Sequence, residues 1–496
     1  MKHIIVRWQR GVPVYAAPVI TPFFMFLCAM GGLSIVLSAY REWAGLGPTT
    51  GMNDIYAWGI WKTFNTMVLT GLGSGGFAVG IAAWIFYRRD MHCVMRTAVL
   101  TSFVAYSSGL VALGVDVGRP WNFYQVLMPW RWNAHSPLLE VALCMPLYAC
   151  FPLFLENTPP LIERWYYTWP QFRPFMVKYL VPAIRRTYPY VIALAYALPM
   201  MHQSSLGALM LLGGSRVHVL WQTPFLPLLY VWAAGFLGFA CVIGVLMVSC
   251  LAWKRPMDTC ILGNLARIMS WLVLSWNAFR FVEILARGQI GAVFAFDRFS
   301  LLFWVETLLL VGPSVYLLLG DNRRIASRLF RADVLIAVGG MLYRFDPTTF
   351  AFTARPGAVY FPSAIEALVA AGYVCLAMAA FILAVKYLPI LPAPVSAWYD
   401  LEHFTRVVHP DWKLEPHEPL ASQSTQFREL KATCASMRRW MADASPKHGL
   451  PAPCGAVSKT FSSAATRAKR GSSRRGSAEC APRCTRSRVF APWKTR

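Results

Sequence analysis

Charged residues are scarce in this chain. Only 14% of its 496 residues are Asp, Glu, Lys or Arg, whereas soluble domains carry about 25%. With 56% hydrophobic residues and a mean hydropathy of +0.44, the composition excludes an ordinary soluble protein and favours one with several membrane spans. Acidic residues are the scarcest charged type, 23 against 47 basic ones. Since the basic residues fall mostly in short loops and in the C-terminal tail, they predict membrane orientation and no nucleic-acid binding.

Closely spaced cysteines and paired histidines are also missing. None of the 12 cysteines forms a Cys-x-x-Cys pair, which excludes the usual spacings of iron–sulfur, zinc and c-type haem sites. Of nine histidines, only His202 falls clearly within an apolar run. Because a b-type haem in a membrane bundle usually needs two facing imidazoles, we expect no haem and no iron–sulfur cluster in this chain.

Ten apolar stretches are long enough, or nearly so, to cross a bilayer, which takes about 20 helical residues. They predict an all-α polytopic bundle with spans near 17–39, 66–87, 94–116, 137–156, 187–211, 225–252, 265–285, 299–320, 327–345 and 363–388. The ninth is the weakest, because Arg331 and Asp333 interrupt its start.

The loops alternate in basic charge. Eighteen lysines and arginines fall on the side of the N-terminus, against nine on the opposite side, and Arg41 and Arg344 are among those nine. Ten spans with both termini in the cytoplasm satisfy this bias. The predicted divisions are a cytoplasmic N-terminus (1–16), a transmembrane bundle (17–392) and a basic, disordered cytoplasmic tail (393–496) that includes AKRGSSRRGS at 468–477.

A glycine-rich string at 71–76 (GLGSGG) resembles a nucleotide-binding fingerprint. It lies inside an apolar span with no strand before it, so nucleotide binding is not expected. The four-residue spacings Gly71/Gly75 and Gly76/Gly80 instead predict close helix packing.

Seven ionisable residues lie within or at the ends of the predicted spans, where a charge is costly and usually has a partner or a function. The predicted topology places them all in the half of the membrane away from the cytoplasm: Asp116, Glu140, His202, Arg280, Glu283, Glu306 and Glu366. Arg280 and Glu283 are i, i+3 neighbours, and pairing with each other is one interpretation. Glu140, with Tyr106 on the preceding span, suits proton exchange with a quinone carbonyl.

The outer loop at 119–135 has several tryptophans beside Arg119, Arg131 and His135. Membrane-interface anchoring and docking of an extracytoplasmic subunit are both compatible with this composition.

Several stretches between about 52 and 392 resemble the NrfD, or polysulfide-reductase, type of integral membrane subunit, and within it most closely the Hyb-type subunit of respiratory nickel–iron hydrogenase-2. They are WGIW (58–61), AYSSGLVALGVDVGRPWN (105–122), NAHSPLLE (133–140), LPMMHQSSLGALM (198–210), VHVLWQ (217–222), FRFVEIL (279–285), FWVE (303–306), YFPSAIEAL (360–368) and LPILP (388–392).

The resemblance implies a haem-free anchor in the bacterial inner membrane that reduces menaquinone or ubiquinone. Its implied partners are membrane lipid, an extracytoplasmic ferredoxin-like iron–sulfur subunit and the large and small hydrogenase subunits. Matched motifs place Tyr106 and Glu140 in quinone and proton chemistry, and place Asp116, Arg119 and His202 near the quinone. Arg280, Glu283 and Glu306 are further proton-relay candidates. The resemblance also leads us to expect an acid in the sixth span, but 240–250 contains none.

Three alternatives stay open at this point. The chain could anchor a molybdenum-type oxidoreductase of sulfur or nitrogen compounds instead of a hydrogenase. A secondary transporter is compatible with ten spans and buried charges, although no paired broken helices are evident. A purely structural anchor would tolerate loss of both Tyr106 and Glu140.

Overall fold

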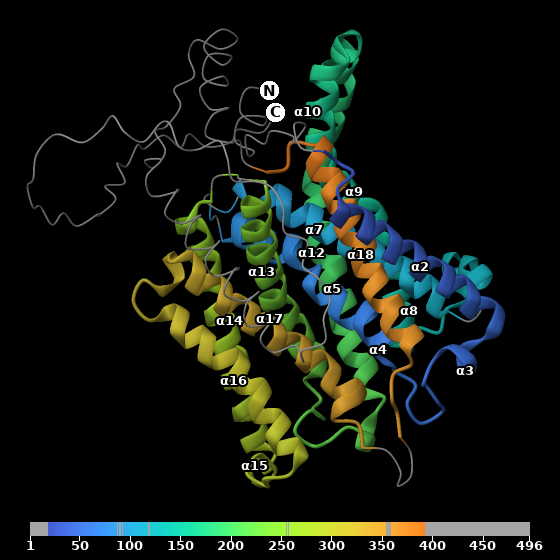
Figure 1. The fold of residues 1–496 in the computed structure, drawn as a ribbon, viewed down its shortest axis with the longest axis vertical. Helices are drawn as coiled ribbons and strands as arrows, with labels where there is room; N and C mark the ends of the chain where they lie inside the picture. The colour runs from blue at the N-terminus through green and yellow to red at the C-terminus, as the bar shows by residue number, and fades with distance from the viewer. Residues whose placement is uncertain are drawn as a thin grey trace, which may run out of the picture. The chain divides into compact units, whose positions relative to one another are not determined.

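The computed structural model describes residues 18–86, 88, 91, 93–117, 120–253, 255, 257–353 and 359–391. All of them belong to one compact unit, Met1–Arg438. These residues are nearly all helical, and the one β pairing among them is a single bridge between Val217 and Phe352 (Figure 1). The predicted all-α class is therefore confirmed, whereas the N-terminal segment and the basic tail lie outside the described residues.

Nine long helices form the bundle. They are α2 (Pro22–Ala44), α7 (Met95–Asp116), α8 (Pro137–Tyr148), α12 (Val181–Leu211), α13 (Leu226–Ala252), α14 (Thr259–Ala286), α16 (Arg298–Leu318), α17 (Ala326–Phe345) and α18 (Ala364–Tyr387) in the described part of the chain. The second predicted span is instead built from five short pieces. Three are α-helical, α4 (Ile60–Lys62), α5 (Leu69–Leu72) and α6 (Gly75–Gly80), and two are π-helical, η1 (Thr63–Val68) and η2 (Ile81–Ile85).

Short elements connect these helices. They are α3 (Leu46–Thr49), η4 (Pro120–Leu127), η5 (Pro129–Arg131), η6 (Ala149–Leu153), α9 (Phe154–Glu156), α10 (Thr158–Thr168), η7 (Pro170–Phe172), α11 (Arg173–Phe175), η8 (Met176–Leu180), η9 (Gly214–Arg216), α15 (Ile290–Val293), η10 (Asn322–Arg324) and η11 (Asp346–Phe350). Because η6 and α9 continue α8, Pro137–Glu156 acts as one span.

Side-chain caps fix where several long helices begin. Thr21 accepts a hydrogen bond from the Phe24 N–H at the start of α2, and Asp258 does the same for Cys260 and Ile261 in α14. Ser363 and Glu366 form a capping box at the start of α18. Each cap satisfies backbone N–H groups that the first helical turn leaves without partners.

Eight helical segments of the described chain are long and apolar enough to cross a membrane. They correspond to eight of the ten predicted spans. The fifth and ninth predicted spans form helices α12 and α17, but they are more polar: α12 contains the His202–Ser205 stretch, and α17 contains Arg328, Arg331, Asp333 and Arg344. These polar residues lower the mean hydropathy of the two helices. The direction of the chain across the membrane stays a prediction.

Helix α13 is central, since it packs against α12, α14, α17 and the glycine-rich second span. The peripheral α2 runs along α18 (Figure 1). The predicted glycine packing is confirmed at Gly75, where an added Cβ would come 2.4 Å from Val242 of α13. An added Cβ at Gly238, on the α13 side, would come 2.6 Å from the Ser74 backbone. No larger residue fits at this crossing.

Candidate functional site

Tyr106 of α7 lies at the centre of a buried polar cluster. Its side chain is fully buried, and Nε2 of Gln203 on α12 donates a hydrogen bond to its hydroxyl oxygen at 3.2 Å. The same amide nitrogen lies 3.3 Å from the Thr70 hydroxyl of α5. The Tyr148 ring packs edge-on at 4.7 Å and the His202 ring at 5.5 Å. Because Gln203 donates to the phenol oxygen, the Tyr106 proton is left to be donated elsewhere.

Glu140 lies beside this cluster but on the surface of the bundle. It stands in the first turn of α8, where its side chain is exposed, and the hydroxyl of Ser205 contacts its carboxylate. The Ser205 hydroxyl is also 2.8 Å from the Met201 carbonyl. An ionised Glu140 can therefore accept from Ser205, whereas a protonated Glu140 can donate to Ser205 while Ser205 donates to Met201. The expectation that Glu140 is enclosed in a low-dielectric interior does not match this position.

His202 and Gln203 connect the two groups through one short stretch of α12. His202 is fully buried, and neither of its ring nitrogens has a hydrogen-bond partner among the described residues. The stretch from His202 to Ser205 thus touches both Tyr106 and Glu140. Of the predicted site residues, the structure brings Tyr106 and His202 into contact, and Glu140 reaches the same stretch of α12 through Ser205.

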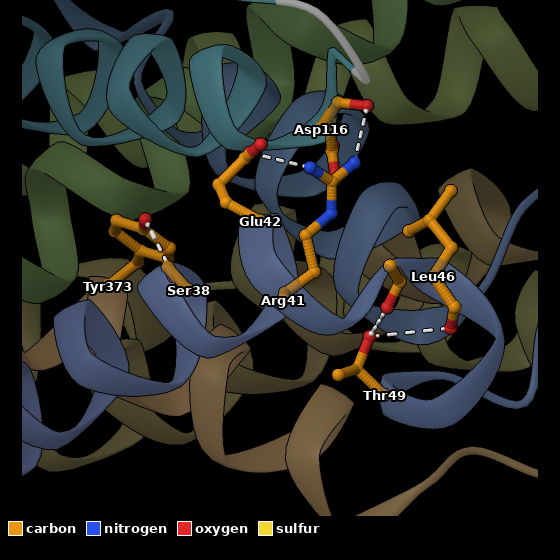
Figure 2. Close-up of polar contacts among 8 residues, drawn as sticks. Ser38, Arg41, Glu42, Leu46, Thr49, Asp116 and Tyr373 are labelled. Atoms are coloured by element: carbon orange, nitrogen blue, oxygen red, sulfur yellow. Dashed lines mark hydrogen bonds and ion pairs between the residues drawn. The ribbon is translucent and has the colours of Figure 1, made fainter.

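Asp116 does not join this group. It ends α7, ten residues beyond Tyr106, which corresponds to roughly 15 Å along a helix. Figure 2 shows Arg41 of α2 between Glu42 and Asp116: one guanidinium nitrogen bonds the Glu42 carboxylate and another donates to the Asp116 backbone carbonyl at 3.2 Å. Arg41 is buried, so its assignment to an outer loop was wrong. Arg119, predicted with Asp116, lies outside the described residues.

A second polar cluster lies between α14, α16 and the end of α17. The Arg280 guanidinium donates to the Glu306 carboxylate, and the Trp221 indole N–H donates to the other oxygen of that carboxylate at 3.1 Å. Asp346, which sequence reasoning missed, is fully buried and interacts electrostatically with Glu306 and Arg280. One guanidinium cannot neutralise two carboxylates, so the buried cluster is balanced in charge when it holds one proton.

Arg280 and Glu283 are not paired with each other. Glu283 bonds Arg287, four residues further along α14, at 2.8 Å, and accepts from the Thr223 hydroxyl at 2.6 Å. Of the proton-relay candidates, Arg280 and Glu306 are therefore in contact, while Glu283 belongs to a separate pair.

Arg344 of α17 lies between the two clusters. It is fully buried and donates to the Tyr230 carbonyl at 2.7 Å, with its guanidinium 4.2 Å from the Tyr230 ring centre. It interacts electrostatically with Tyr106 and His202 on one side. The Tyr343 ring is 5.7 Å from Tyr230, and the Arg280 guanidinium is 5.0 Å from Tyr343. Polar and aromatic groups thus extend continuously from the Tyr106 cluster to the Glu306 cluster.

Sequence reasoning placed Arg344 in an outer loop, and this was wrong. Arg344 and Asp346 flank the end of an apolar run, where charged residues ordinarily reach water. The one signal that could have found them is their position: a base and an acid directly follow two or more apolar turns of the same helix. Asp333 also lies inside the bundle, 3.2 Å from where a Cβ at Gly244 would be. An acid from α17 therefore faces the sixth span, which has none of its own.

Across the described residues, no three His, Cys, Asp or Glu side chains are grouped so that they could hold a metal ion.

Comparison with known proteins gives a consistent picture. Residues 48–346 match the family model described as "Polysulphide reductase, NrfD". The chain is 34% identical over 363 residues to the "Probable Ni/Fe-hydrogenase 2 b-type cytochrome subunit" of Escherichia coli, covering 73% of this chain and 90% of that protein. It is 32% identical over 180 residues to the "Menaquinone reductase, integral membrane subunit" of Nitratidesulfovibrio vulgaris, covering 35% of this chain and 39% of that protein. It is 24% identical over 93 residues to one of the subunits of the selenate reductase of Mesobacillus selenatarsenatis, covering 19% of this chain and 22% of that protein.

The name of the E. coli relative contradicts the expectation that this chain has no haem, because a b-type cytochrome is a haem protein. His202, with both ring nitrogens unpartnered, is the described residue within the bundle that could serve as an axial ligand. The other described histidines, His135 and His218, lie in loops. The described residues therefore do not provide a pair of axial histidines.

Proposed function

The chain belongs to the NrfD family of polytopic membrane subunits, and from this we propose that it is the quinone-reactive subunit of a respiratory hydrogenase complex. In this proposal an extracytoplasmic ferredoxin-like iron–sulfur subunit delivers electrons that originate in the hydrogenase large and small subunits. The acceptor is menaquinone or ubiquinone in the bacterial inner membrane. The names of the hydrogenase and menaquinone reductase relatives support this assignment.

One observation carries the proposal: a single turn of α12 contacts both a buried phenol and a surface carboxylate. Gln203 bonds Tyr106 in the interior, and Ser205 bonds Glu140 at the surface. Reduction of one quinone takes two electrons from the partner's clusters and two protons, one for each carbonyl oxygen. In this proposal Tyr106 donates a hydrogen bond to a carbonyl, and Glu140 takes up protons at the surface of the bundle and passes them inward through Ser205.

The direct test is hydrogen-dependent quinone reduction in membranes with and without this chain. We expect quinone reduction to be lost without it, while hydrogen oxidation with a soluble artificial acceptor continues. If quinone reduction continues without the chain, the hydrogenase assignment is wrong.

Variants test the residues. We expect Glu140→Gln and Tyr106→Phe each to lower quinone-linked turnover at least tenfold while the complex still assembles, because each removes one proton-transfer group. Ser205→Ala should act in the same direction. Ser204→Ala is the matched control, since among the described residues the Ser204 hydroxyl bonds only the Met201 carbonyl, at 3.0 Å. Normal turnover in an assembled Glu140→Gln complex would remove Glu140 from the mechanism.

A second candidate partner comes from the similarity to part of a selenate reductase. In that case the chain would be the quinone-reactive anchor of a molybdenum-type oxidoreductase of sulfur or nitrogen compounds. The same membranes distinguish the two, because quinone-linked activity would then require an oxyanion or sulfur substrate and would not respond to hydrogen.

A further inference from the structure

A groove lies on the surface between α16 and α17, away from the Tyr106 and Glu306 clusters. Its volume is about 400 Å³. Its apolar wall includes Gly312, Pro313 and Leu335, and its polar rim is formed by Tyr316, Arg328 and Arg331. The wall and the rim have the opposite chemical character that an amphipathic ligand requires.

The groove lies where a membrane span ends. Helix α16 is a candidate span that ends at Leu318, and Gly312 is six residues, or about 9 Å, before that end. Arg328 and Arg331 lie in the first two turns of the next helix, α17. The rim is therefore at the level of lipid headgroups, and the wall is at the level of the upper acyl chains.

The charge around the rim is strongly positive. Residues 321–331 contain four arginines and one acid, Asp321, a net charge of +3. Asp321 is exposed and lies 3.7 Å from Arg324, so it does not neutralise the groove. The Asp333 carboxylate is buried against Gly244 on another face of α17. The groove is thus complementary in charge to an anion.

The two rim arginines are held in place without using their charge. Arg328 donates to the Asn322 side-chain oxygen at 2.7 Å, and Arg331 donates through Nε to the Ser327 carbonyl at 3.2 Å. Neither makes an ion pair with a described residue. Their remaining guanidinium N–H groups can bind phosphate oxygens, for which the planar guanidinium is well suited.

We propose that this groove binds an anionic phospholipid. The Arg328 and Arg331 guanidinium groups bind the phosphate, the Tyr316 hydroxyl contacts the glycerol region, and an acyl chain lies over Gly312, Pro313 and Leu335. A zwitterionic lipid would place a second, positive headgroup charge beside the arginines, so the groove selects net negative lipids.

The test uses the purified full chain in a neutral detergent and a fluorescent short-chain phosphatidylglycerol. We expect the chain to bind the phosphatidylglycerol at least tenfold more tightly than the matching phosphatidylcholine. We expect Arg328→Gln/Arg331→Gln to abolish that preference. Arg131→Gln, an exposed arginine in the loop before α8, should leave it unchanged. Equal affinity for the two lipids, or full retention in the double variant, would overturn the proposal.

A second variant tests the acyl part with the charges intact. No atom lies within 4 Å of a Cβ built at Gly312, so Gly312→Leu fills the groove without an internal clash. We expect it to weaken phosphatidylglycerol binding at least fivefold, whereas Gly32→Leu, at an equally open position on α2, should not. Unchanged binding in Gly312→Leu would contradict the acyl contact. Competition by inorganic phosphate at the concentration of the lipid would show that the ligand is a soluble anion and would overturn the lipid assignment.

Discussion

Removing Arg280 should be among the most destabilising single changes in the bundle. The Arg280 and Glu306 side chains are 4% and 0% exposed, and Asp346 adds a second buried carboxylate. Arg280→Met keeps most of the aliphatic volume but leaves Glu306 without its cation. Loss of one partner from a buried pair costs about 3–5 kcal/mol. The guanidinium also lies 4.7 Å from the Trp276 ring centre and 5.1 Å from that of Phe303, contacts that Met replaces only in part.

A double-mutant cycle separates the ion pair from packing. Glu306→Gln still accepts the Trp221 N–H and leaves Arg280 beside Asp346, so its own cost should be smaller. In Arg280→Met/Glu306→Gln no uncompensated Glu306 charge remains. The double variant should therefore be about 2 kcal/mol more stable than the sum of the two single costs predicts. The assay is reversible unfolding by sodium dodecyl sulfate in mixed micelles, followed by circular dichroism.

The more exposed pair on the same helix is the control. The Arg287 side chain is 26% exposed and pairs with Glu283, which keeps the Thr223 hydroxyl as a partner. The Glu283 side chain is 8% exposed, and Arg287 also donates to the Val219 carbonyl at 2.9 Å, so Arg287→Met should cost about 1–3 kcal/mol, less than Arg280→Met. Two results would contradict a strong buried ion pair: an Arg280→Met cost no greater than that of Arg287→Met, or simple additivity of the changes at Arg280 and Glu306.

Two further predictions concern packing and pH. Gly238→Ala should destabilise the bundle by about 1–3 kcal/mol, because its Cβ would come 2.6 Å from the Ser74 backbone. Gly235→Ala is the control: it is one turn away, the nearest contact of its Cβ is at 3.9 Å, and it should be neutral or slightly stabilising in the same unfolding assay. Burial lowers the pKa of His218, in the loop before α13, below its ordinary value of 6.5; Asp297 opposes this effect and Arg298 adds to it. His218 therefore binds a proton more readily in the unfolded chain than in the folded one, so stability falls as the pH drops below about 6.5. His218→Gln should reduce the loss of Tm between pH 7 and pH 5. An identical loss of Tm in the variant would contradict this.

The bundle was largely predictable because bilayer crossing imposes a length and a composition. Apolar runs of about 20 residues identified eight spans directly, and four-residue glycine spacing identified the close crossing at Gly75. The sequence could not predict that α4, η1, α5, α6 and η2 divide the second span, because at the break the Gly76 N–H bonds a side chain of a neighbouring helix, Ser102 of α7.

The candidate site was predictable only in part. Tyr106 and His202 are in ring contact, and Glu140 is joined to the same stretch of α12 through Ser205, because α12 packs along α8. The partner of Arg280 was not predictable, since Glu306 is 26 residues away and the choice over Glu283 depends on how α14 is rotated against α16. The exposure of Glu140 and the burial of Arg344 were not predictable either. The first follows from the rotation of α8, and the second depends on the contact of Arg344 with Tyr230.

The interrupted second span has a consequence for how the protein is made. Where the helix breaks before Gly76, the backbone N–H of that residue donates to the Ser102 hydroxyl of α7 at 2.6 Å. In hydrocarbon an unpaired N–H costs several kcal/mol, so this segment is incomplete until the third span arrives beside it. The two spans therefore have to mature in the membrane as a pair. When the ribosome adds the last residue of the second span, it has not yet synthesised Ser102, on which that span depends.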